Sequence, residues 1–158
     1  MTGSEPALEL VEIHILGMPV DAYREASEHG DELLREFALI REQEAEGGRE
    51  VPRRLLRLVD ELTDRFSGFT ATQTAELAEA IARGAKTVDL HYLVPPSVKN
   101  ACISLGAMLD EVDEFCRQGE ELLTLATPPR AVAFRNWYLD QFIRQVDGKE
   151  PTTWREAG

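Results

Sequence analysis

Two short segments of the chain alternate between apolar and polar residues. They span residues 8–16 and residues 87–94. The apolar positions are Val11, Ile13 and Ile15 in the first segment, and Val88, Leu90, Tyr92 and Val94 in the second. Successive side chains of a strand point to opposite faces, so each segment predicts a strand with one apolar face.

The two segments share one pattern: valine, acid, aliphatic, histidine, any residue, leucine. It reads VEIHIL at residues 11–16 and VDLHYL at residues 88–93. Each copy runs into a proline and then into a long helix-like segment, in which Phe37 of the first copy matches Phe115 of the second. The repeat fits either an internal duplication or chance, and the sequence leaves both open.

Apolar residues at helical spacing fill most of the remaining chain. Glycines and a proline between residues 44 and 52 end the first helical segment. The SGF triplet at residues 67–69 separates the second segment from the third, and Gly84 follows the third as a helix-ending glycine. The predicted helices span residues 20–46, 52–66, 71–83, 98–116 and 128–146.

A lone strand leaves its backbone donors and acceptors without partners, so the two strands are expected to pair. A two-stranded ribbon is marginal alone, so its apolar face should lie on the helices. The sequence leaves open whether the pairing is parallel or antiparallel, and whether it joins one chain or two. The predicted fold is α+β and mainly helical, with five helices and one ribbon. We expect one domain at residues 8–148, a flexible leader at residues 1–7, and a loosely held tail at residues 149–158 that packs only through Trp154.

The composition limits the kinds of partner. The 158 residues carry a net charge of −12 and include two cysteines. Nucleic acids and anionic membrane surfaces attract basic proteins, so this charge disfavours both. No apolar run approaches the ~18 residues that span a bilayer, and the first ten residues lack the basic and apolar regions of a secretory signal. We therefore expect a cytoplasmic protein with free thiols.

Four polar residues would share the outer face of the paired strands: Glu12, His14, Asp89 and His91. Imidazole and carboxylate groups are ligands for zinc and other divalent metals. The same residue types are also the ordinary content of a solvated sheet face. The sequence therefore gives a candidate metal site beside the simpler interpretation of an exposed polar surface.

The last helical segment holds the densest group of aromatic residues. Phe134, Trp137, Tyr138 and Phe142 fall within nine residues, and the apolar stripe around them is wider than a surface helix needs. Tryptophan and tyrosine are enriched at the centres of protein interfaces. We expect these four residues either to be wrapped by the domain or to face another chain.

Two further groups have simple explanations. Glu25, His29, Glu32 and Glu36 form a polar ridge on the first helical segment, where an exposed charged face is expected. Cys102 and Cys116 lie on the apolar stripe of one helix, about 21 Å apart at 1.5 Å per residue, too far for a disulfide.

Three stretches, VDLHYLVP at residues 88–95, EELLTLATPP at 120–129 and RNWYLDQFIRQVDGKEPTTW at 135–154, resemble a group of small bacterial proteins. That group accompanies partner-switching regulators: anti-sigma kinases, their antagonists and the phosphatases that act on them. The chain lacks the ATP-binding boxes of the kinases and the phosphorylatable-serine pattern of the antagonists. The resemblance thus implies a companion of such a system, and it supplies no functional residues.

The sequence predicts a non-catalytic protein-interaction or regulatory module that needs no cofactor, and the resemblance implies a role in sigma-factor or stress signalling. Its partner would be another protein or a second copy of the chain, with the aromatic C-terminal helix as the contact surface. The alternative is a metal- or ligand-binding sensor, or an enzyme, that uses the acid and histidine face of the strands. The sequence contains no P-loop, G-x-G-x-x-G, H-E-x-x-H, C-x-x-C or G-x-S-x-G motif.

Overall fold

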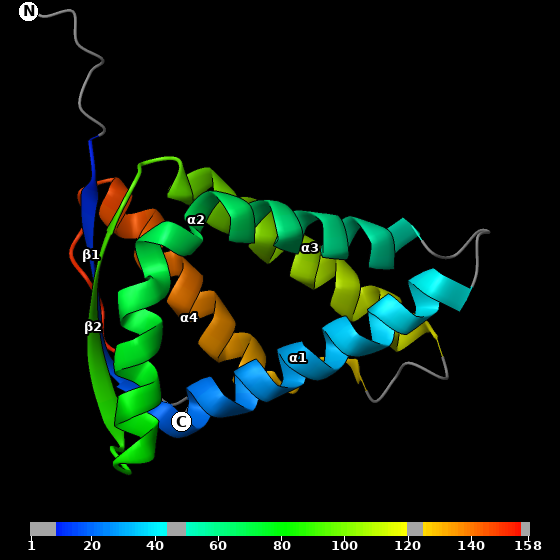
Figure 1. Cartoon of the computed structure of the whole chain (residues 1–158), viewed down its shortest axis with the longest axis horizontal. Coiled ribbons are helices and arrows are strands. Elements are labelled where there is room, and N and C mark those ends of the chain that lie inside the picture. Colours follow the sequence, from blue (N-terminus) through cyan, green and yellow to red (C-terminus); the bar gives the residue numbers. More distant parts are fainter. Residues whose placement is uncertain (1–8, 44–49, 120–124, 156–158) are drawn as a thin grey trace, which may run out of the picture.

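A computed structural model describes residues 9–43, 50–119 and 125–155 of the chain. Within these residues there are four helices and a two-stranded antiparallel sheet, which confirms the α+β, mainly helical class. The helices extend from one side of the ribbon (Figure 1). None of the helices in the described ranges is long and apolar enough to cross a membrane. The elements are β1 (Val11–Pro19), α1 (Val20–Gln43), α2 (Glu50–Ala82), β2 (Thr87–Val94), α3 (Val98–Gln118) and α4 (Pro129–Val146).

The first strand is longer than its sequence pattern predicted. We expected the Gly-Met-Pro sequence after Leu16 to end it, but β1 continues to Pro19. The pairing is irregular between Ile15 and Met18, and Gly17 adopts a positive φ of 63° there. Only glycine takes this conformation at little cost, so the chain makes a bulge instead of a stop. Met18 is thereby brought opposite Val88 and is fully buried.

The prediction of separate helices at residues 52–66 and 71–83 was wrong. They belong to one continuous helix, α2. Figure 1 shows that α2 changes direction sharply between its teal and green halves, as helices do at glycine and serine pairs. Phe66 and Phe69, on either side of Gly68, both pack against the core. This packing outweighs the cost of about 1 kcal/mol for glycine inside a helix.

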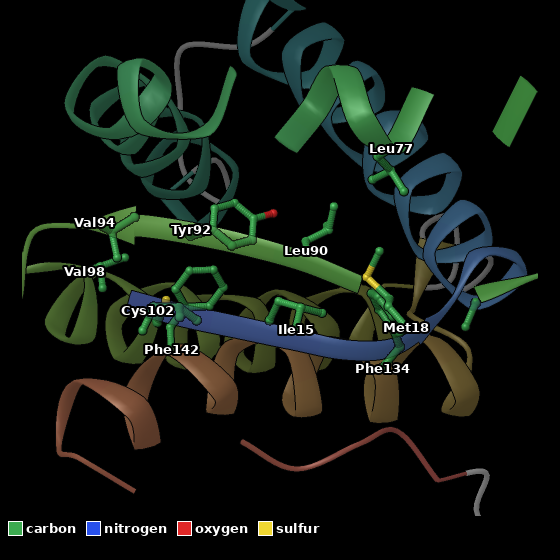
Figure 2. Packing of buried hydrophobic residues seen from close by; sticks show 12 residues of the cluster. Ile15, Met18, Leu77, Leu90, Tyr92, Val94, Val98, Cys102, Phe134 and Phe142 are labelled. Atoms are coloured by element: carbon green, nitrogen blue, oxygen red, sulfur yellow. The ribbon is translucent and has the colours of Figure 1, made fainter. Parts of the chain in front are cut away.

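The buried face of the ribbon forms the larger of two core clusters with all four helices. Figure 2 shows Leu90 and Tyr92 of β2 and Ile15 of β1 beside Phe142 and Phe134 of α4. The smaller cluster lies away from the ribbon, among α1, α2 and α3. It consists of Leu33, Phe37, Leu55, Met108, Val112, Cys116 and Leu125. The apolar faces of the two strands therefore lie on the helices, as the alternation predicted.

Residues after α4 pack back along that helix. The indole of Trp154 lies 5.8 Å from that of Trp137, centroid to centroid. Thr152 adds contacts that the sequence did not suggest. Its carbonyl oxygen accepts a hydrogen bond from the Trp137 indole N–H, and its backbone N–H donates to the Gln141 side chain.

Candidate functional site

The outer face of the ribbon brings the two histidines of the repeated pattern together. His14 lies directly opposite His91 in the antiparallel register, and their rings stack with centroids 4.7 Å apart. When two strands with the same pattern pair antiparallel, only one position of the pattern lies opposite its own match in the partner strand. In this ribbon that position is the histidine.

The backbone groups of both histidines point away from the partner strand. The side-chain amide of Gln145 accepts a hydrogen bond from the His14 N–H and donates one to the His14 carbonyl oxygen. On the other edge, Gln73 donates to the His91 carbonyl oxygen. The two histidines therefore form a non-hydrogen-bonded pair, the type in which opposite side chains come closest.

Glu12 completes this group, which we name the ribbon triad: Glu12, His14 and His91. A Glu12 carboxylate oxygen lies 3.0 Å from Nε2 of His91, so this nitrogen donates to the carboxylate. One nitrogen or oxygen of each residue falls within 4.8 Å of those of the other two, and all three side chains are exposed. The arrangement offers two imidazoles and one carboxylate to a single small ion.

Asp89, the fourth residue of the predicted group, lies outside the triad. Its carboxylate accepts a hydrogen bond from the backbone N–H of Gly17, at 2.7 Å. Asp89 matches Glu12 in the repeated pattern, but the bulge in β1 offers it a backbone donor that Glu12 does not have. The bulge thus makes the two halves of the polar face unequal.

The aromatic residues of α4 contact the interior of their own chain. Phe134 and Phe142 are buried, and Trp137 and Tyr138 pack against the same cluster. The hydroxyl groups of Tyr138 and Tyr92 are 2.7 Å apart, and burial raises the pKa of Tyr138 well above its usual value. These contacts account for the wide apolar stripe within one chain, and the predicted interface stays a prediction.

A second site lies on another side of α4, where α1, α3 and α4 line an open cavity of about 390 Å³. We refer to it as the three-helix cavity. Its polar lining includes His29, Thr127 and Arg135. Its walls are mainly apolar and include Ala26, Leu33, Leu105, Leu109, Phe134 and Leu139.

The polar groups around this cavity are held in place by internal bonds. Asp113, only 3% exposed, accepts a hydrogen bond from the backbone N–H of Thr127 and pairs with the Arg135 guanidinium at 3.2 Å. Arg135 also pairs with Asp110 at 2.8 Å. Nε2 of His29 lies 2.8 Å from the carbonyl oxygen of Leu125; since a carbonyl only accepts, this nitrogen carries the proton. The polar lining is therefore fixed before any ligand binds.

The remaining candidates lie outside the ribbon triad, and among them only His29 also lines the three-helix cavity. Glu25, His29 and Glu32 of the polar ridge line a shallow acidic depression on α1. Cys102 and Cys116 are buried and unpaired. Burial raises the pKa of Cys102 to about 12 and that of Cys116 to about 11, so both thiols stay protonated at neutral pH.

Sequence reasoning missed four polar residues that organise these sites: Gln73, Asp113, Arg135 and Gln145. Asp113 directly follows Val112 on the apolar stripe of α3, and Gln145 lies among the apolar residues of α4. A polar side chain at a buried helical position needs a partner. That signal was available, although the identity of the partner was not.

Comparison with known proteins gives no assignment, since no protein-family model, no curated protein and no solved structure matches the chain.

Proposed function

We propose that the protein is a non-catalytic cytoplasmic regulatory module that senses a small, uncharged and mainly apolar molecule in the three-helix cavity. The observation that carries this proposal is the cavity itself, about 390 Å³ in volume with mainly apolar walls. Small-molecule sites in proteins have volumes of roughly 300–1,000 Å³, apolar walls and a few well-placed polar groups. The cavity has all three properties.

The charges around the cavity favour an uncharged ligand. Arg135 is the guanidinium in its lining, and it already faces the carboxylates of Asp110 and Asp113. An anionic ligand would have to compete with these two carboxylates for Arg135, and a cationic ligand would have to give up its water against mainly apolar walls. The Thr127 hydroxyl already donates to Asp113, so its oxygen lone pairs and the His29 ring are left to orient a neutral polar group.

Binding would act through the packing of α1 against α4, because the two helices form facing walls of the cavity. A ligand that contacts both walls favours the arrangement in which they are correctly spaced. A protein partner, or a second copy of the chain, would then respond to this arrangement. The net charge of −12 favours a basic partner surface. The resemblance to companions of partner-switching regulators supports this kind of regulatory role.

The test uses the uncharged fluorescent probe N-phenyl-1-naphthylamine. We expect saturable binding of one equivalent, with the blue-shifted emission of an apolar site. Leu105→Trp should abolish binding because the indole would occupy the cavity. The matched control is Ile103→Trp, since Ile103 lies on the same helix but is exposed; it should bind the probe as the unchanged protein does.

Circular dichroism would establish that both variants fold. If Leu105→Trp does not fold, Ala26→Leu would fill the cavity from the α1 wall with a smaller side chain. Absence of saturable binding to the unchanged protein, or equal binding to the filled and control variants, would rule out this function.

A further inference from the structure

We propose that the ribbon triad of Glu12, His14 and His91 binds one divalent transition-metal ion such as Zn²⁺. This inference is independent of the proposed function. The triad lies on the outer face of the ribbon, and the three-helix cavity shares no residue with it.

The spacing of the three side chains suits one ion. Their ligand atoms lie within 4.8 Å of one another. Ligands at 2.0–2.1 Å from a tetrahedral zinc ion are roughly 3.3 Å apart. Small rotations of the side chains close this difference, because all three are exposed. The stacked imidazoles must turn so that one nitrogen of each faces the ion.

The backbone beneath the triad is held at the required spacing. His14 and His91 form a non-hydrogen-bonded pair, so their side chains start close together. Gln145 and Gln73 bond the backbone of these same two residues from the two edges of the ribbon. The ion would therefore join two positions that are already aligned, and little chain entropy would be lost on binding.

The ligand set selects the class of metal. Two imidazole nitrogens with one carboxylate favour Zn²⁺, Cu²⁺, Ni²⁺ or Co²⁺, whereas Mg²⁺ and Ca²⁺ prefer oxygen ligands. Three protein ligands leave a fourth tetrahedral position for water, and the exposure of the triad allows water to reach it.

The direct experiment is a calorimetric titration of the full chain, purified without a metal-affinity tag, with zinc sulfate. We expect one equivalent to bind, and magnesium sulfate under the same conditions to give no binding. Loss of an outer partner of a metal ligand weakens binding by about 10- to 100-fold. His14→Ala and His91→Ala remove ligands, so each should weaken binding by at least as much, and Glu12→Gln should weaken it as well.

Two control variants make the result specific. Asp89→Asn changes the nearby acid outside the triad, and asparagine can still accept the Gly17 N–H. His29→Ala removes the third histidine of the chain, on α1. Both should bind zinc as the unchanged protein does. The triad side chains are exposed, so their variants should fold, which circular dichroism would verify.

Absence of zinc binding, or binding lost in His29→Ala but kept in His14→Ala and His91→Ala, would overturn the proposal. The same variants separate it from the proposed function, since His14→Ala should still bind N-phenyl-1-naphthylamine. Leu105→Trp should still bind zinc.

Discussion

Phe37 and Phe115 occupy matching positions in the two copies of the strand-turn-helix pattern, and their rings contact each other edge to face, with centroids 5.9 Å apart. His14 and His91, which also match, stack on the ribbon. One matching pair lies on the strands, and the other lies at the smaller core cluster, which contains Phe37 and contacts Phe115. Both contacts join a position of one copy to its match in the other, as an approximate two-fold relation between the copies requires.

The contact between Phe37 and Phe115 should be measurable as a coupling free energy in a double-mutant cycle. Phe37→Ala should lower the free energy of unfolding by about 3–5 kcal/mol, because the side chain is fully buried. A cycle with Phe37→Leu, Phe115→Leu and the double variant should give a coupling of about 0.5–1.5 kcal/mol in urea denaturation. Strictly additive single variants would mean that the two rings do not stabilise each other.

Gln145 should contribute more to stability than a surface glutamine. Gln145→Ala leaves the N–H and carbonyl of His14 without their partner, and each group left unpaired costs about 1–3 kcal/mol where water does not replace it. Gln118→Ala is the control, since Gln118 is exposed and its side chain donates to Glu114 on its own helix. Chemical denaturation would compare them; equal losses would contradict the role of Gln145.

The ion pair between Asp113 of α3 and Arg135 should contribute more to stability than an exposed ion pair that another α3 residue makes. Asp113→Ala leaves the largely buried guanidinium without this partner, and breaking a buried pair costs about 3–5 kcal/mol. Glu111→Ala removes the exposed pair with Arg54 and should change stability little. If thermal unfolding shows similar losses for both, Asp113 is not the organising residue described above.

The buried thiols should make the fold sensitive to alkaline pH. Folding raises the pKa of Cys102 to about 12 and that of Cys116 to about 11, against an ordinary value near 8.5. The contribution of the two buried thiols to stability is complete below about pH 8.5. Above that pH the thiols of the unfolded chain lose their protons while those of the folded chain keep theirs. The free energy of unfolding therefore falls. Urea denaturation between about pH 8.5 and 10 should show this fall. It should flatten in the double variant with Cys102→Val and Cys116→Val; an unchanged slope would contradict the assignment.

Gly68 in α2 is a place where alanine should stabilise the protein. A Cβ atom there would meet no other atom within 4 Å, so Gly68→Ala should add about 0.5–1 kcal/mol. Gly84 has a positive φ of 74°, and Gly84→Ala should remove about 1–2 kcal/mol. Thermal unfolding would measure both changes. A loss of stability in Gly68→Ala would mean that the bend of α2 needs glycine.

Periodicity explains how much of this fold could be predicted. A strand repeats every two residues, so the alternation around His14 and His91 was enough to assign one face to the core and the other to water. It also placed Glu12 with the two histidines. The direction of pairing was open, because an apolar face looks the same in parallel and antiparallel ribbons.

Local signals failed where distant contacts decide the structure. The SGF sequence around Gly68 predicted a helix end, but the packing of Phe66 and Phe69 keeps the helix continuous. Asp89 seemed equivalent to Glu12 until the bulge gave it a donor at Gly17. The three-helix cavity depends on the relative placement of three helices, which no short pattern encodes.

The glutamines that bond His14 and His91 also limit how the protein associates with itself. A two-stranded ribbon has two free edges, and an uncovered edge invites a strand from another molecule. At the middle of one edge, Gln145 forms hydrogen bonds with the backbone N–H and carbonyl of His14 in β1. On the other edge, Gln73 donates to the His91 carbonyl of β2. Edge-to-edge growth into aggregates must therefore first displace two buried side chains, which protects a sheet that has only two strands in the described part of the chain.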